Sequence, residues 1–121
     1  MDRQNVFDWL WTVNCLGCGN IRIWDIMDNF RSAAAARAAL EDRGRRREFL
    51  SESERNSAER TSAEQINQLI GYCESRNIYI LTFDDELYPE RLRSIYNPPA
   101  VLFCRGDMSC LESDFSISVV G

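Results

Sequence analysis

The hydrophobic pattern of this chain changes period once, near residue 77, and this change constrains its fold more than any other feature. Before that point, apolar side chains recur at i, i+3, i+4 and i+7, which is the spacing of amphipathic helices. After it, short runs rich in β-branched and aromatic residues predict strands. The sequence therefore predicts an α+β to α/β chain, with a helical module at residues 1–76 and the start of an α/β unit at residues 77–121.

Helices are predicted in the first part over residues 5–14, 20–30, 32–43 and 61–76. Asn20 and Ser32 are expected N-caps, because short polar side chains accept hydrogen bonds from the first backbone N–H groups. The third helix is expected to end at Gly44, which can adopt the left-handed C′ conformation. The fourth opens with a capping box at residues 61–64. Its expected apolar stripe is Ile66, Leu69, Ile70 and Cys73. Residues 45–60 are so polar that they predict a weakly packed helix or a connector.

Three strands are predicted after residue 77, over residues 78–83, 101–104 and 115–121. A short helix from Pro89 to Ile95 separates the first two, with Leu92 and Ile95 expected to face inward. The third run becomes fully apolar and reaches Gly121. A doubly wound domain approaches its phosphate-binding loop in this way.

Charge restricts the function of the chain. The formal net charge is −5, from 19 acidic side chains and 14 basic ones, and every basic side chain is arginine. A dedicated nucleic-acid module usually carries the opposite sign, so tight DNA binding by this chain alone is not expected. The sequence shows neither a signal peptide nor an apolar run long enough to span a membrane. We therefore expect a cytoplasmic protein whose five cysteines are reduced thiols.

Two candidate sites lie close together between the first and second predicted helices. A turn containing Gly17, Gly19 and Asn20 could bind a phosphate through free backbone N–H groups, or it could simply join two tightly packed helices. Cys15 and Cys18 have the spacing of half a zinc site or of a redox pair. They also suit apolar filling of the hairpin. A zinc site would need two more ligands and the chain has no histidine, so no metal is expected, and no cofactor is expected either.

Two clusters of charge invite a functional interpretation. The basic run consists of Arg43, Arg45, Arg46 and Arg47. It could contact DNA electrostatically, although such runs more often form a solvated face that also complements a helix C-terminus. The acidic cluster at residues 84–86 has no histidine, lysine or nucleophile pattern beside it. It is better explained as a turn than as a catalytic site.

Residues 78–121 resemble the DprA/Smf family of DNA-processing proteins. The resemblance rests on an apolar strand, a Tyr-Pro pair, a Pro-Pro pair followed by Val-Leu-Phe, and a last strand ending in Val-Gly. The matching residues are Tyr88, Pro89, Leu92, Pro98, Pro99, Gly106 and Gly121. The amino-terminal region of that family is a small bundle that resembles helix-hairpin-helix or SAM-like domains. Residues 15–19 occupy the place of its Gly-containing turn, with Leu16 in place of the usual proline and Cys18 in place of an aliphatic residue.

The resemblance implies a non-enzymatic recombination mediator with a Rossmann-like main domain. Members of the family bind single-stranded DNA, help to load the RecA recombinase and act in natural transformation. Their DNA-binding surface lies chiefly on the Rossmann-like domain, and of that surface the chain would contain only Gly121. The chain is therefore expected to be an amino-terminal fragment. A homodimer would form through the missing domain, and no membrane partner is expected.

An alternative function is that of a helical protein–protein interaction module without DNA binding. The predicted apolar face of the first helix consists of Val6, Leu10 and Val13. Exposed Trp9, Trp11 or Trp24 would then serve as the anchors of the interface, because tryptophan is enriched at such positions. An enzyme on a Rossmann-like fold is poorly supported, since it would need an extended Gly-rich motif and catalytic acids beyond the third strand.

Overall fold

The computed structural model describes residues 2–16 and 22–105. The elements in these ranges are, in chain order, α1 (Arg3–Leu16), α2 (Arg22–Phe30), α3 (Ala33–Glu41), α4 (Arg43–Phe49), α5 (Glu52–Arg60), α6 (Ala63–Ser75), β1 (Ile78–Thr82), α7 (Glu90–Arg93) and β2 (Val101–Arg105). They form a mainly helical α+β structure with one small sheet. No helix in the described ranges is both long and apolar enough to cross a membrane.

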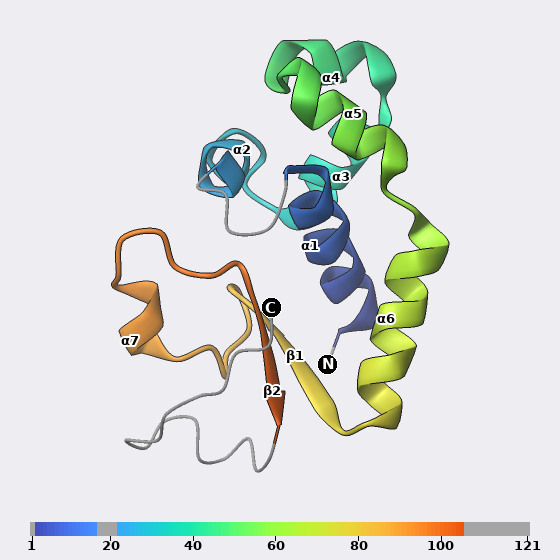
Figure 1. Cartoon of the computed structure of the whole chain (residues 1–121). Coiled ribbons are helices and arrows are strands. Elements are labelled where there is room, and N and C mark those ends of the chain that lie inside the picture. The colour runs from blue at the N-terminus through green and yellow to red at the C-terminus, as the bar shows by residue number, and fades with distance from the viewer. Residues whose placement is uncertain (1, 17–21, 106–121) are drawn as a thin grey trace.

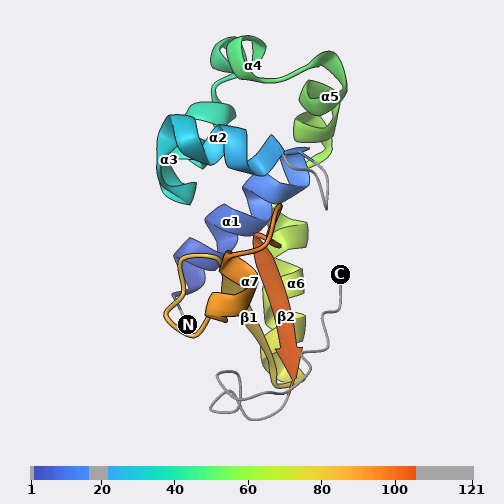
Figure 2. The same ribbon diagram turned by 90° about the vertical axis from the view of Figure 1, so that its left-hand side faces the viewer.

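Helix α1 is the centre of the structure. It packs against α2, α3, α5, α6 and β1 (Figure 1). Helices α4 and α5 lie beyond one end of α1, and the sheet with α7 lies toward the other, as the turned view in Figure 2 also shows. A helix with neighbours on this many sides must bury more than a single stripe.

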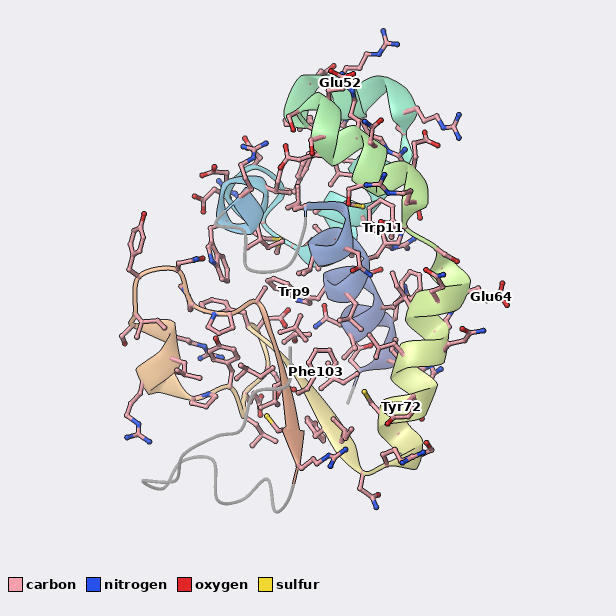
Figure 3. All side chains as sticks on the ribbon, viewed as in Figure 1. Trp9, Trp11, Glu52, Glu64, Tyr72 and Phe103 are labelled. Atoms are coloured by element: carbon pink, nitrogen blue, oxygen red, sulfur yellow. The ribbon has the colours of Figure 1, made fainter. Side chains whose placement is uncertain are left out.

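The burial of α1 corrects the predicted exposure of its tryptophans. Val6 and Leu10 are buried as the hydrophobic period predicts, but Trp9 is only 2% exposed and Trp11 only 5%. Figure 3 shows both side chains within the body of the molecule. They cannot anchor a partner protein in this state. The prediction was wrong because an apolar stripe predicts packing on one side of a helix, whereas α1 has neighbours on several sides.

Polar side chains start the helices that follow α1. Ser32 caps α3 by accepting a hydrogen bond from the Ala35 backbone N–H at 3.1 Å, as predicted. The predicted end of this helix was wrong, because Gly44 lies inside α4. The Asp42 carboxylate accepts a hydrogen bond from the Gly44 N–H at 2.9 Å and so starts the new helix.

Residues 45–60 form parts of two packed helices and are not a connector. Ser51 and Glu54 make a reciprocal capping box at the start of α5, and α5 packs on α1. Leu50 and Ala58 are buried in the main core. The Ser-x-x-Glu spacing of this capping box was present in the sequence. The high polarity of the segment concealed it.

Helix α6 lies within the predicted span, but the predicted capping box at residues 61–64 was wrong, because the N-cap is Ser62, whose hydroxyl accepts a hydrogen bond from the Gln65 N–H. Three residues of the predicted stripe, Ile66, Ile70 and Cys73, are buried. Leu69 is 37% exposed, so its place in the stripe was wrong. Ile95, predicted to face inward after Pro89, is likewise 48% exposed because α7 ends at Arg93.

Strands β1 and β2 pair antiparallel, with Ile78 opposite Arg105 and Thr82 opposite Val101. One face of the sheet joins the helical core through Ile80, which is fully buried. The other face carries a small second cluster of Leu81, Tyr88, Leu102 and Cys104. The predicted third strand at residues 115–121 lies outside the described residues. The Rossmann-like unit, the helix-hairpin-helix likeness and the division at residue 77 stay predictions.

A buried ion pair connects α1 to α3. The Arg37 guanidinium donates to the Asp8 carboxylate, whose side chain is 3% exposed, and also to Glu41 at 2.6 Å. Gln4 donates a further hydrogen bond to Asp8 at 3.0 Å. These donors compensate the carboxylate for its lost hydration, since a buried charge is tolerated only when it is paired and hydrogen-bonded.

We expect Asp8→Ala to lower the free energy of unfolding by about 3 kcal/mol, because it removes the buried partner of Arg37. The matched control is Asp25→Ala, which breaks the exposed Arg22–Asp25 pair on α2. That control should cost about 0.5 kcal/mol or less. Urea unfolding followed by far-UV circular dichroism measures both values. Equal losses in the two variants would contradict the structural importance of the buried pair.

Candidate nucleic-acid interface

Several predicted site residues lie outside the described residues. They are Gly17, Gly19, Asn20, Gly106 and Gly121. Phosphate binding by the turn between α1 and α2, and by the glycine at residue 121, therefore stays a prediction. The described residues do contain the basic run, the groove beside it and most of the family motif.

Helical geometry divides the basic run on α4. Arg46 is only 8% exposed, and its guanidinium donates to the Leu40 carbonyl oxygen and pairs with Glu59 at 3.3 Å. Arg43 is exposed and pairs with the same carboxylate at 3.1 Å. Arg46 is therefore a structural residue that joins the end of α3 to α5. It does not belong to an accessible patch.

The other two arginines of α4 remain at the surface. Arg45 places its guanidinium 5.8 Å from the centre of the Phe30 ring. Phe30 in turn contacts Phe49 edge to face, with ring centres 4.9 Å apart. Neither Arg45 nor Arg47 forms an ion pair with a residue that the structure describes. DNA contact by these side chains stays a prediction.

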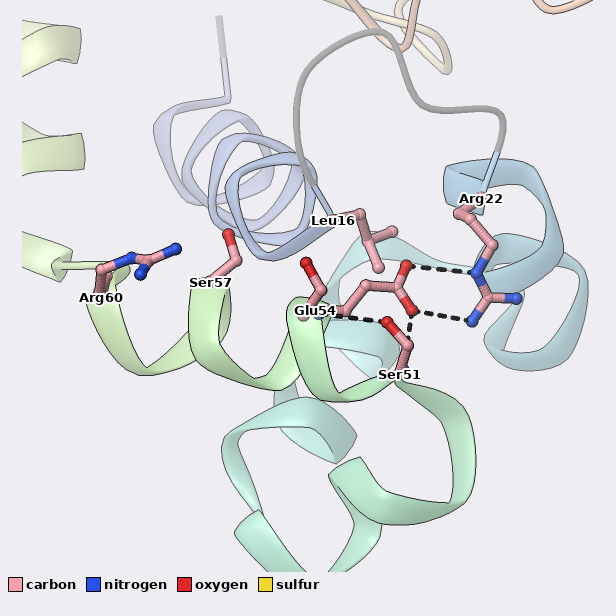
Figure 4. Close-up of a pocket in the computed structure, with 7 residues that line it drawn as sticks. Leu16, Arg22, Ser51, Glu54, Ser57 and Arg60 are labelled. Atoms are coloured by element: carbon pink, nitrogen blue, oxygen red, sulfur yellow. Dashed lines mark hydrogen bonds and ion pairs between the residues drawn. The ribbon is translucent and has the colours of Figure 1, made fainter.

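A groove of about 560 Å³ lies along one face of α5 (Figure 4). Ser53, Ser57 and Arg60 line it from α5, and Arg22 lines it from the start of α2. Apart from Leu16 at the end of α1, its named lining side chains are polar or charged. The groove was not predicted from the sequence, although the i, i+4, i+7 spacing of the three α5 residues could have indicated their common face.

The single carboxylate of the groove is fully engaged. Glu54 accepts hydrogen bonds from the Ser51 backbone N–H at 2.9 Å and from Arg22 Nε at 3.2 Å. Burial alone would raise the pKa of Glu54. These hydrogen bonds and the charge of Arg22 outweigh burial and lower the pKa below its ordinary value. Glu54 is therefore ionised, and its charge is balanced by Arg22.

The family-motif residues form a compact unit between β1 and β2. Tyr88 is 2% exposed, and its hydroxyl donates to the Pro99 carbonyl oxygen at 2.6 Å. Arg93 lies over both the Tyr88 ring and the Phe83 ring, at 5.4 and 5.5 Å from their centres. Its guanidinium also donates to the Phe83 carbonyl oxygen at 2.9 Å. The bend at Pro98–Pro99 is thereby fastened to the end of the first strand.

Burial also changes the pKa of the Tyr88 phenol in this unit. It raises the pKa of Tyr88 to about 12, with Arg93 partly opposing the change. The phenol therefore keeps its proton under ordinary conditions and can serve as the hydrogen-bond donor to Pro99.

The acidic cluster has a structural role that the sequence did not reveal in full. Asp84 accepts hydrogen bonds from the Asn5 side chain at 3.0 Å, from Trp9 Nε1 at 3.1 Å and from the Thr82 hydroxyl. Asp85 accepts one from the Leu87 backbone N–H, as expected of a turn. Asp84 thus joins the end of β1 to α1. The two segments are far apart in the chain, so no local sequence pattern could predict this contact.

The environment of Cys15 favours packing over redox or metal chemistry. Its side chain is fully buried, and burial raises the pKa of the thiol to about 11, although the hydrogen bond to Thr61 and the charge of Arg46 act in the opposite direction. A protonated thiol is neither a nucleophile nor a metal ligand. Cys18 lies outside the described residues. Within the described ranges, no three Cys, Asp or Glu side chains lie close enough to hold a metal ion.

Comparison with known proteins identifies the region that contains the Tyr88 unit. Residues 79–121 match the family described as DNA recombination-mediator protein A. A 57-residue stretch of the chain is 35% identical to the DNA processing protein DprA of Bacillus subtilis (strain 168). This end of the chain resembles DprA. The family recognised in the sequence is confirmed for this DprA-like segment, residues 79–121. The match to the relative covers 47% of this chain and 19% of the relative's own length. No solved structure shows a significant match.

We expect Tyr88→Phe in the DprA-like segment to lower the free energy of unfolding by about 1 kcal/mol, because the Pro99 carbonyl oxygen loses its buried donor. Tyr96→Phe is the matched control, since Tyr96 is 87% exposed and should tolerate the loss of its hydroxyl. Urea unfolding curves measure both changes. A result in which both variants match the parent chain would show that the Tyr88–Pro99 bond contributes nothing.

We expect Cys15 to react with iodoacetamide at least about 100-fold more slowly in the folded chain than in urea, because at about pH 8 almost none of the buried thiol is ionised. In the folded chain the rate should increase about tenfold for each unit by which the pH is raised, as long as the pH stays below the raised pKa of the thiol. Mass spectrometry of the Cys15 peptide after timed labelling measures the rate. Equal rates in folded and unfolded chains would contradict the burial argument.

Proposed function

We propose that this chain takes part in handling single-stranded DNA, in the manner of a DNA recombination mediator, and that it catalyses no reaction. The observation that carries the proposal is the match of residues 79–121 to the DNA recombination-mediator protein A family. The packing of Tyr88, Pro99 and Arg93 supports it, because the described motif residues of that segment meet in one folded unit.

Phosphate neutralisation by arginine is the binding mode that suits this composition. Arginine holds phosphate in a bidentate manner, and every basic side chain of the chain is an arginine. The net charge of −5 means that the molecule as a whole repels the negatively charged DNA backbone. Binding should therefore be local, weak and strongly dependent on salt. Loading of the RecA recombinase and pairing with a second subunit belong to the same proposal for the whole protein.

A non-enzymatic role agrees with how the acidic residues are used. Asp84 accepts hydrogen bonds from three side chains, and Asp85 accepts one within its turn. A general acid or base needs a proton-accepting atom that faces the substrate. These two carboxylates are instead engaged in holding the end of β1.

We expect the chain to bind a fluorescent oligothymidylate with a dissociation constant above about 1 µM near physiological salt, and more tightly as salt is lowered. Fluorescence anisotropy at several salt concentrations measures the affinity and its slope against log salt. A duplex of the same length is the control and should bind no more tightly. Absence of binding even at low salt would overturn the proposal. A sub-micromolar constant at physiological salt would overturn the expectation of weak binding.

A further inference from the structure

Side-chain contacts through Arg22 link the α5 groove to the aromatic pair beside α4 in one strip. We name this the arginine strip, and it consists of Arg60, Arg22, Phe49, Phe30 and Arg45. Ser57 and Arg60 follow Glu54 at steps of three residues, so all three lie on one face of α5. Figure 4 shows their side chains in a row, with Arg22 facing Glu54.

Arg22 is the junction between the two halves of the strip. Its guanidinium donates to the Glu54 carboxylate in the groove and, through Nη2, to the Phe49 carbonyl oxygen at 2.6 Å. The Phe49 ring then contacts Phe30, and the Arg45 guanidinium lies over Phe30. Arg22 therefore joins the groove on α5 to the aromatic pair and to Arg45 of α4, and Arg60 belongs to the strip because it lines the same groove.

The two ends of the strip carry available positive charge. Arg60 and Arg45 are exposed, and neither forms an ion pair with any residue in ranges 2–16 and 22–105. The Glu54 carboxylate between them is compensated by Arg22 and by the Ser51 backbone N–H. Arg22 is matched by Glu54 and by Asp25, so the positive charge that the strip offers to a ligand is that of Arg45 and Arg60.

The middle of the strip offers aromatic surface. Phe30 and Phe49 are half-buried against the main core, so each ring is held in place and still partly open to solvent. Fixed cations interleaved with aromatic rings are the combination that binds single-stranded nucleic acid without sequence preference, since phosphates meet the charges and bases meet the rings.

We propose that the arginine strip is a single-stranded DNA contact on the helical part of the chain, in which Arg45 and Arg60 each neutralise a phosphate and the phenylalanine pair supports the bases between them. This inference rests on the proposed function, and it adds a site that lies outside the DprA-like segment. It also separates Arg45 from Arg43 of the same basic run, because Arg43 faces Glu59 and lies off the strip.

The test compares Arg45→Gln, Arg60→Gln and their double variant with Arg43→Gln, the matched control from the same helix as Arg45. Binding is measured by anisotropy with an oligothymidylate of about 15 nucleotides, a length within the range of known single-strand sites. Each strip variant should reduce the slope of log affinity against log salt by about 0.7, and the double variant by about 1.4. Arg43→Gln should keep the parent slope, and Arg45→Lys should keep it too because it preserves the charge.

The outcomes distinguish this inference from the proposed function. If the parent chain binds and the double variant retains the parent slope of log affinity against log salt, the arginine strip is not the DNA contact and DNA binds elsewhere. If Arg43→Gln lowers the slope as much as Arg45→Gln, the run acts as a diffuse charge and the strip is again wrong. If the parent chain and the Arg43→Gln control both fail to bind at low salt, the proposed function itself fails. Unchanged circular dichroism melting curves are expected for all of these variants, since none removes a buried contact.

Discussion

The burial of α1 on most of its sides is the constraint on which the rest of the structure depends. A helix in this position must satisfy its polar side chains inside the protein, because water cannot reach them. Asp8 does so with Arg37 of α3, and Thr12 donates to the Asp8 carbonyl oxygen. The buried Trp9 indole and the half-buried Asn5 side chain instead donate to Asp84, an exposed carboxylate at the end of β1. The polar groups of one helix therefore fix the positions of α3 and of the end of β1, while its apolar groups supply much of the core.

The sequence predicted the elements whose signals are local. The Ser32 cap, the span of α6 and the two described strands follow from capping residues and from hydrophobic period. It failed where tertiary packing decides the outcome. Trp9 and Trp11 look like candidate surface anchors until five elements surround α1. Leu69 fits the stripe of α6 but lies at its margin, beyond the reach of the core.

The candidate site shows the same division. Four arginines within five residues suggest a single basic patch, but a helix turns each successive side chain by about 100°. One of them is consequently buried against Leu40, another pairs with Glu59, and Arg45 meets Phe30. The spacing on α5 could have placed Arg60 beside Ser53 and Ser57, but the contribution of Arg22 could not be predicted, because Arg22 meets Glu54 only through tertiary contact. In the DprA-like segment the sequence was more informative, since Tyr88 and the Pro98–Pro99 bend lie close together along the chain and meet through local contacts.

The hydrogen bonds to Asp84 have a consequence for synthesis of the protein. Asn5 and Asp84 are separated by 79 positions, and Trp9 and Asp84 by 75. Helix α1 therefore leaves the ribosome well before β1, and these hydrogen bonds cannot form until β1 has been synthesised. During that interval the tryptophan and leucine side chains of α1 are exposed to solvent, and such transient apolar surface promotes aggregation or recruits chaperones. The helix that later organises the core is thus exposed to aggregation while the chain is being made.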